Sequence, residues 1–116
     1  MKRSDHQHKF MCDFMLLLAF IIHVKGYKVT ATWLGRNKQV QAALVEKGLS
    51  RTMNSKHLKN QAVDLNIFID GKFIQEKGPL EEIGVYWENL DPLNRWGGNF
   101  TGYGINGDYG HFERNS

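Results

Sequence analysis

Two histidines and one aspartate in this chain have the side-chain types of a catalytic zinc site. His57 comes seven residues before Asp64, and His111 lies much later in the sequence. Catalytic zinc usually takes three protein ligands, mostly imidazole and carboxylate groups, and keeps its fourth position for water. Two neutral imidazoles and one carboxylate leave the site with a net charge of about +1, which favours ionisation of bound water near pH ~7. These three residues are therefore candidate metal ligands.

Each candidate also has an ordinary structural role open to it. A single histidine is more often a surface residue or a hydrogen-bonded interior residue than a metal ligand. Asp64 could cap a turn, and residues 108–113 could form a polar strand. The residue types alone leave the structural and the functional interpretation open.

The sequence around Asp64 predicts a strand that holds this carboxylate away from the core. In residues 62–69 apolar side chains occupy alternate positions from Val63 to Ile69. This period of two is typical of a strand with one buried face. Asp64 then lies on the other face, and a short polar turn before the strand would bring His57 back beside it.

Helical and extended patterns elsewhere in the chain predict the remaining elements. In chain order they are a helix over 9–24 ended by Gly26, a strand over 27–33, a helix over 36–47, a hairpin turn at Asp70-Gly71 into 72–74, a helix over 79–90 with Pro79 in its first turn, and a strand around 111–113. A glycine after a helix, an Asp-Gly pair between strands and a proline in a first turn are ordinary signals for these boundaries. The order predicts an α+β fold in which helices flank a small antiparallel sheet.

The segment after Pro92 combines six glycines with five aromatic residues. Such a glycine content is common in flexible tails, but this many aromatic side chains are costly to leave in water. We expect folded loops that line a cleft, followed by the short strand around 111–113.

The length and charge of the chain set limits on its class. At 116 residues with a formal net charge of +3, the chain is expected to form one domain over residues 1–116. The basic residues are scattered rather than clustered on one segment, which argues against a nucleic-acid partner. The single cysteine, Cys12, excludes an intramolecular disulfide, and its apolar neighbours predict a place in the core.

The apolar run over residues 14–24 could be mistaken for a secretory signal. It is shorter than the roughly 20 residues that span a bilayer, Asp13 adjoins it, and no small-x-small cleavage pattern follows. We interpret it as a helix of the domain, and we expect neither stable membrane insertion nor an export signal.

Four segments resemble, in the same order, motifs of the zinc D-Ala-D-Ala peptidase family. "SKHLKNQAVDL" resembles S-x-H-x-x-x-x-A-x-D, and "DYGHFE" resembles D/E-x-x-H. "GRNKQVQAALVEKGLSRTMNSKH" is similar to the R-x-x-x-x-Q and G-x-S segments upstream, and "RWGGNF" is similar to the W-G-G segment. The family includes VanY-like carboxypeptidases, D,D-dipeptidases and phage L-alanyl-D-glutamate endopeptidases, and it shares its fold with the hedgehog signalling domain.

The resemblance implies a hedgehog/DD-peptidase-like fold and a role for each matching residue. His57, Asp64 and His111 would bind Zn²⁺. Asp108 falls at the general base of the family. Arg36 falls at an arginine that contacts the substrate or its oxyanion, and Ser55 falls at a serine that shapes the turn or binds substrate.

The chain departs from the family pattern at a few positions. Asn60 replaces a glycine common between the histidine and the alanine, and asparagine tolerates a left-handed backbone better than most residues. Asn99 replaces an acidic residue that often follows W-G-G, which leaves a contact to substrate or to a ligand unassigned. "TWLGR" before Arg36 is also atypical.

The function that the resemblance implies is zinc-dependent hydrolysis of the peptidoglycan stem peptide. We expect a monomeric L-alanyl-D-glutamate endopeptidase of the endolysin type, phage or prophage encoded, which stays in the cytoplasm until it is released to the cell wall. The alternatives are a D-alanyl-D-alanine carboxypeptidase and a non-catalytic, hedgehog-like zinc-binding module.

Overall fold

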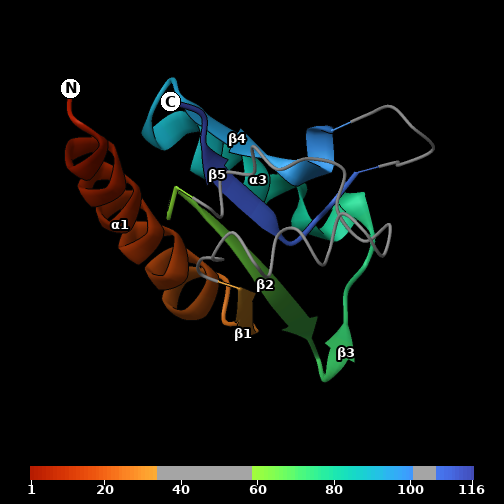
Figure 1. Cartoon of the computed structure of the whole chain (residues 1–116). Coiled ribbons are helices and arrows are strands. Elements are labelled where there is room, and N and C mark those ends of the chain that lie inside the picture. The colour runs from red at the N-terminus through yellow and green to blue at the C-terminus, as the bar shows by residue number, and fades with distance from the viewer. Residues whose placement is uncertain (34–58, 101–106) are drawn as a thin grey trace.

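The computed structural model describes residues 1–33, 59–100 and 107–116, and these form helices packed against an antiparallel sheet (Figure 1). In chain order the elements are α1 (Arg3–Ala19), the π-helix η1 (Phe20–Val24), β1 (Lys28–Trp33), β2 (Ala62–Ile69), β3 (Lys72–Phe73), α3 (Lys77–Leu90), β4 (Asn94–Trp96), the 3-10 helix η2 (Gly97–Asn99) and β5 (His111–Arg114). The predicted α+β class with a small antiparallel sheet is confirmed. The predicted helix over 36–47 lies outside the described residues.

The sheet has the strand order β1-β2-β5-β4, and β3 also pairs with β2. All of these pairs are antiparallel. Because β1 pairs with β2 through both Asp64 and Phe68, β5 and β3 must share the opposite edge of β2. β5 therefore lies between β2 and β4, while the short β3 hairpin covers the far end of the β2 edge.

The core lies between the helices and one face of the sheet. It combines apolar residues of α1 and α3 with those of the strands: Phe10, Phe14, Leu17, Ile21, Val63, Leu65, Ile67, Leu80, Ile83, Trp87, Trp96 and Phe112. The alternation predicted for residues 62–69 is confirmed, since Val63, Leu65 and Ile67 are buried while Asp64 and Asn66 are partly exposed. The opposite face of β2 is thus free to carry polar groups.

Trp87 joins α3 to the neighbouring strands β4 and β5. Its indole Nε1 lies 3.2 Å from the carbonyl oxygen of Arg95 and 3.1 Å from that of Glu113, and it donates to both. The ring also packs edge-on against Phe112, with centroids 6.0 Å apart. β4 and β5 are therefore fixed from the core side at the level of Glu113.

The turn signals in the sequence correspond to left-handed residues in the structure. Asp70 and Gly71 have φ values of 51° and 80°, as a two-residue hairpin turn between β2 and β3 requires. Gly26 has φ 72° after the first helix. The predicted hairpin and the predicted helix end are both confirmed.

The first helix begins earlier than predicted. Its predicted start at residue 9 is wrong, because the polar residues from Arg3 onward are helical. The backbone N–H of Lys2 donates to Asp5 Oδ2 at 2.9 Å, which caps the first turn. Gln7 Nε2 donates to the carbonyl oxygen of Lys59 at 2.8 Å. The first turns of α1 have no apolar pattern, and this contact to the segment before β2 stabilises them.

The prediction that residues 93–110 form only loops is wrong for Asn94–Trp96. These residues pair with β5, so that Trp96 lies opposite Phe112 and Arg95 opposite Glu113. Three residues are too few for an alternating pattern to be recognised in the sequence. Residues 101–106 of the same segment lie outside the described residues.

Helix α1 contributes one face to the core and leaves another uncovered. With η1 it forms a continuous stretch of 22 residues that is long and apolar enough to cross a membrane by those two criteria alone. Phe10, Phe14, Leu17 and Ile21 are buried, which agrees with a helix of the domain. The expected absence of membrane insertion and of an export signal stays a prediction.

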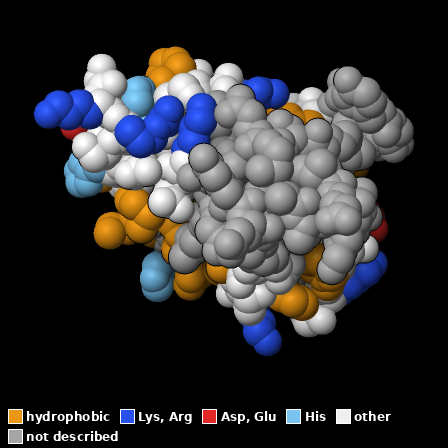
Figure 2. All heavy atoms as spheres, in the orientation of Figure 1, with side chains coloured by type: hydrophobic (Ala, Val, Ile, Leu, Met, Phe, Trp, Pro, Cys, Tyr) orange, Lys and Arg blue, Asp and Glu red, His pale blue; other side chains and the backbone are white. Residues whose placement is uncertain are grey.

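The exposed face of α1 carries hydrophobic side chains that reach the surface (Figure 2). They include Met11, Met15 and Leu16. Cys12 lies on this face, exposed, with its Sγ 3.5 Å from His8 Nε2. The prediction of Cys12 in the core is therefore wrong, because the buried face of the helix passes through Phe10 and Phe14 instead.

Candidate metal-binding and active site

The site begins with the pairing of β2 and β5. Their register places Asp64 directly opposite His111 and Val63 directly opposite Phe112. Since successive side chains alternate between the faces of a strand, burial of Val63 and Phe112 in the core puts Asp64 and His111 together on the other face. Two residues that are 47 positions apart in sequence thus become cross-strand neighbours.

The His111 ring is held at both nitrogens. Nδ1 lies 2.9 Å from Asp64 Oδ1, and Nε2 lies 2.8 Å from Glu113 Oε1. Burial alone would lower the pKa of His111, but the hydrogen bonds and the charges of the two carboxylates outweigh it and raise the pKa from 6.5 to about 9. The ring therefore sits in a strongly anionic environment, which is also favourable for a divalent cation.

Asp108 approaches from the turn that precedes β5. Its backbone N–H donates to the carbonyl oxygen of Gly97 at 2.7 Å, and its own carbonyl oxygen accepts from the N–H of His111 at 3.1 Å. A Cβ on Gly97 would lie 2.2 Å from the Asp108 carbonyl oxygen, and one on Gly110 would lie 2.1 Å from that of Leu65. Both glycines are needed for this turn to pack closely against η2 and β2.

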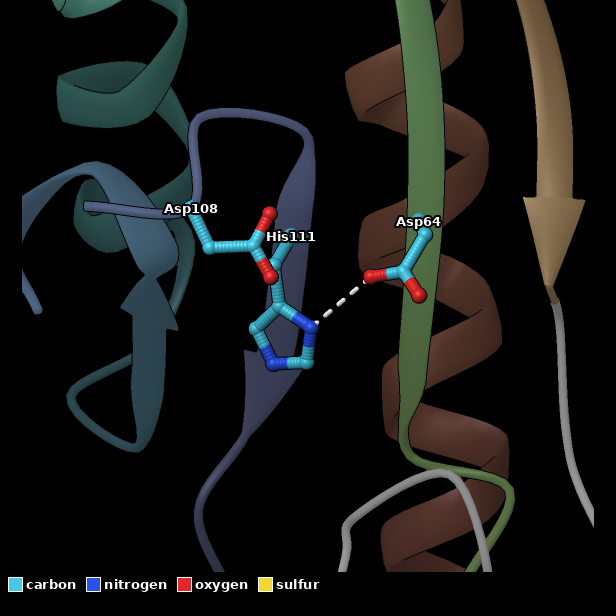
Figure 3. A group of neighbouring side chains, drawn as sticks. All are labelled: Asp64, Asp108 and His111. Atoms are coloured by element: carbon cyan, nitrogen blue, oxygen red, sulfur yellow. Dashed lines mark hydrogen bonds and ion pairs between the residues drawn. The ribbon is translucent and has the colours of Figure 1, made fainter. Parts of the chain in front are cut away.

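The three side chains converge in Figure 3. Asp64 extends from β2, His111 from β5 and Asp108 from the turn before it, and the dashed line joins Asp64 to the His111 ring. Asp108 is exposed, Asp64 partly exposed and His111 buried. One donor atom from each residue lies within 4.8 Å of the other two.

This donor set fits a first-row divalent metal. Two ligand atoms bound to one tetrahedral zinc at roughly 2.0–2.1 Å are about 3.3 Å apart. His111 Nδ1 and Asp64 Oδ1 are 2.9 Å apart, so a shift of a few tenths of an ångström would bring both to the ligand distance. Imidazole nitrogen and carboxylate oxygen also match the ligand preferences of zinc. Asp108 lies near enough to Asp64 and His111 to act either as a further metal ligand or as a general base.

Some predicted site residues fall outside the described part of the chain. His57, Arg36 and Ser55 lie in residues 34–58, and their assignments stay predictions. Asn60, which is described, has φ 53°, so the expectation that asparagine can replace glycine in a left-handed turn is confirmed. Just before β2, Asn60 therefore has a backbone conformation that glycine and asparagine adopt more readily than most residues.

Asn99 contacts α3. Its Nδ2 lies 3.2 Å and 3.3 Å from the two carboxylate oxygens of Glu88. Glu88 Oε2 also accepts the backbone N–H of Trp96 at 3.0 Å. In the structure, Asn99 thus helps to connect η2 to α3.

Glu113 was not among the predicted site residues. It follows His111 by two positions in the same strand, so both side chains lie on one face of the sheet. The predicted strand around 111–113 already placed the two residues on one face, but only the structure shows Glu113 Oε1 beside His111 Nε2.

A cavity of about 490 Å³ borders the cluster. It is lined by polar and apolar residues of β1, β2, the β3 hairpin and the turn before β5, including Thr32, Asp64, Asn66, Phe73, Gln75, Asp108 and Tyr109. Its position matches the gap on the β2 edge between β5 and β3. The prediction of a cleft lined by the glycine-rich segment is confirmed for residues 107–110.

Comparison with known proteins identifies a similar fold. No family model matches the chain, and no curated protein sequence matches it. The crystal structure of Serratia marcescens L-Ala D-Glu endopeptidase ChiX is similar, with a TM-score of 0.71 and 20% sequence identity over 98% of this chain and 86% of that chain. The two proteins share an α+β fold with a small antiparallel sheet.

Proposed function

We propose that this chain is a metal-dependent peptidase that hydrolyses the L-Ala-D-Glu bond of the peptidoglycan stem peptide. The observation that carries the proposal is the cluster of Asp64, Asp108 and His111, which lies beside a cavity in a fold shared with an L-Ala D-Glu endopeptidase. The motif resemblance described above supports the same reaction class.

In this proposal His57, Asp64 and His111 hold one zinc ion. When bound, zinc would supply a Lewis acid to the attacking water and the scissile carbonyl. Three imidazole and carboxylate ligands leave the fourth coordination position of zinc for water. In this proposal His57 would be the third ligand.

Asp108 acts as the general acid–base residue. Its carboxylate is exposed next to the buried His111, where a substrate can reach it. It accepts a proton from the attacking water and passes this proton to the leaving nitrogen. A module that only binds metal has no use for a carboxylate in this position, which favours an enzyme over a non-catalytic domain.

The adjacent cavity would seat the stem peptide. Its volume of about 490 Å³ lies within the range of ligand sites, roughly 300–1,000 Å³. Along its wall, Asn66 Nδ2 donates to Thr30 Oγ1 at 3.2 Å and to Thr32 Oγ1 at 2.9 Å. These polar groups of β1 and β2 extend the site away from Asp64 toward the β3 hairpin.

The choice of bond rests on the base and on the similar structure. In the resembling family, enzymes that remove D-alanine tend to carry glutamate as base, and the phage-type endopeptidases tend to carry aspartate, as at Asp108. Arg36 would bind the carboxylate that D-Glu presents close to the scissile amide. Release of the protein to the wall from the cytoplasm, by phage-type lysis, is part of the same proposal.

Mass spectrometry of fragments from purified peptidoglycan tests the proposal. We expect new N-terminal D-Glu and no free D-alanine. Release of D-alanine from a pentapeptide stem would instead support the carboxypeptidase. Intact fragments after incubation with the zinc-loaded protein would support the non-catalytic module.

A further inference from the structure

Glu113 contacts the proposed metal ligand His111 from the side opposite Asp64. Its Oε1 lies 2.8 Å from His111 Nε2, while Nδ1 lies 2.9 Å from Asp64 Oδ1. The Glu113 side chain is only 9% exposed. The imidazole is therefore held at both ring nitrogens. Nδ1 faces Asp64 of the proposed metal site, and Nε2 faces the buried carboxylate of Glu113.

The sheet fixes Glu113 on three sides. β5 is paired on both edges, so that Glu113 lies opposite Ala62 of β2 and opposite Arg95 of β4. Arg95 Nη1 lies 4.0 Å from Glu113 Oε2, and Trp87 Nε1 donates to the Glu113 carbonyl oxygen. The carboxylate thus approaches His111 from a rigid backbone and keeps a cation near its second oxygen.

A neutral imidazole can bind a metal through only one nitrogen, because the other carries the proton. A carboxylate that accepts the N–H of the second nitrogen fixes the tautomer and the orientation of the ring. We propose that Glu113 is a positioning residue that holds His111 with its proton on Nε2, which makes Nδ1 the metal-binding atom. This inference rests on the proposed metal site, and it adds to that site a residue that does not touch the metal.

Zinc affinity and the tautomer of His111 provide readouts that do not depend on activity. In the zinc-loaded wild-type protein, nitrogen-15 NMR of the imidazole is expected to show a metal-bound Nδ1 and a protonated Nε2. In competition with a chromophoric chelator, Glu113→Ala is expected to bind zinc about 10–100-fold more weakly. Glu113→Gln retains an oxygen that accepts the same N–H, and it is expected to recover most of that affinity.

Glu88→Ala is the matched control. Glu88 also accepts hydrogen bonds, but among the described residues they come from Trp96 and Asn99 and not from His111. Its removal is expected to leave zinc affinity and the His111 spectrum unchanged. An equal loss of affinity in Glu88→Ala and Glu113→Ala would show a general structural effect and overturn the inference.

Two other outcomes would overturn it. Wild-type affinity in a folded Glu113→Ala protein would remove Glu113 from the site, and a wild-type spectrum with metal on Nε2 would exclude the proposed tautomer. The spectrum needs no variant, so the inference stays testable even where Glu113→Ala does not fold. A wild-type protein that binds no zinc would reject the metal site itself, whereas normal zinc binding with an insensitive Glu113 would reject only the role of Glu113.

Discussion

Asp64 and His111 are direct partners across β2 and β5, and the Asp64 Oδ1 to His111 Nδ1 distance is 2.9 Å. The sheet register alone brings these two candidate ligands together. The core on the other side of the sheet holds that register, because a slip by one residue would expose Val63 and Phe112. The placement of Asp64 beside His111 is therefore a property of the sheet rather than of a loop.

Loss of the Asp64 carboxylate is expected to remove the metal. Loss of a residue that only hydrogen-bonds to a ligand weakens metal binding by up to roughly 100-fold. Asp64→Ala should weaken zinc binding by more than this, because a ligand itself is lost. Asn66→Ala is the control, since Asn66 lies two residues further on the same strand face and its side chain donates to Thr30 and Thr32. Chelator competition measures both variants, and equal affinities would contradict the assignment of Asp64.

Loss of the Asp108 carboxylate is expected to separate metal binding from catalysis. If Asp108 is the base, Asp108→Ala keeps zinc near full occupancy while kcat on a stem-peptide substrate falls by about 100-fold or more. Metal content by atomic emission and single-substrate kinetics give the two readouts. Loss of zinc together with activity would identify Asp108 as a ligand instead.

Gly84 of α3 is expected to tolerate no side chain. A Cβ there would lie 2.1 Å from two ring atoms of Trp96, so Gly84→Ala should lower the free energy of unfolding by about 1–3 kcal/mol or more. Gly78→Ala in the same helix is the control, because among the described residues no atom beyond its chain neighbours and its own helix backbone lies within 4 Å of its Cβ position. Urea unfolding compares the two variants, and similar stabilities would contradict close packing of Trp96 on α3.

Asp91 is expected to make stability depend on acid pH. Burial would raise its pKa, but the N–H of Leu93, the ion pair with Arg114 at 2.9 Å and the charge of Lys9 outweigh it and lower the pKa below 3.8. A carboxylate with a lowered pKa stabilises the fold above its unfolded pKa, and this contribution is lost as the pH falls through the folded pKa.

Asp91→Asn should therefore lower the free energy of unfolding at pH 7 by about 1–3 kcal/mol, the usual range for losing a hydrogen-bonded charged partner. The difference from wild type should shrink as the pH falls below 3.8, the ordinary value for this group. Urea unfolding at a series of pH values measures it. A difference that stays constant down to acid pH would show that the charge of Asp91 contributes nothing.

Local patterns predicted the elements on which the site depends. The alternation in residues 62–69 identified the strand and the face of Asp64, and Asp70-Gly71 identified the hairpin that ends it. These features are set by neighbours in sequence, so the residues themselves reveal them. The motif around His111 likewise pointed to the second candidate ligand in the described cluster.

Features set by distant contacts could not be predicted in the same way. β4 is too short to show a pattern, and it exists because it pairs with β5. The first turns of α1 are polar, and contacts such as Gln7 to Lys59 hold them. For β4 and for the first turns of α1, a residue far away in sequence determines the structure. Glu113 is close to His111 in sequence, but its contact with the ring became visible only in the structure.

The position of β5 within the sheet also affects the order of events during synthesis. Among the described strands, β5 comes last in the chain, yet it lies between β2 and β4. Until β5 is available to pair, β2 can pair with β1 and β3, but no described strand joins it to β4. Pairing across such long sequence separations forms slowly, because closing the loop costs conformational entropy before the contacts form. Asp64 and His111 therefore come together only when β5 is inserted between β2 and β4, and zinc affinity is expected to appear with that step.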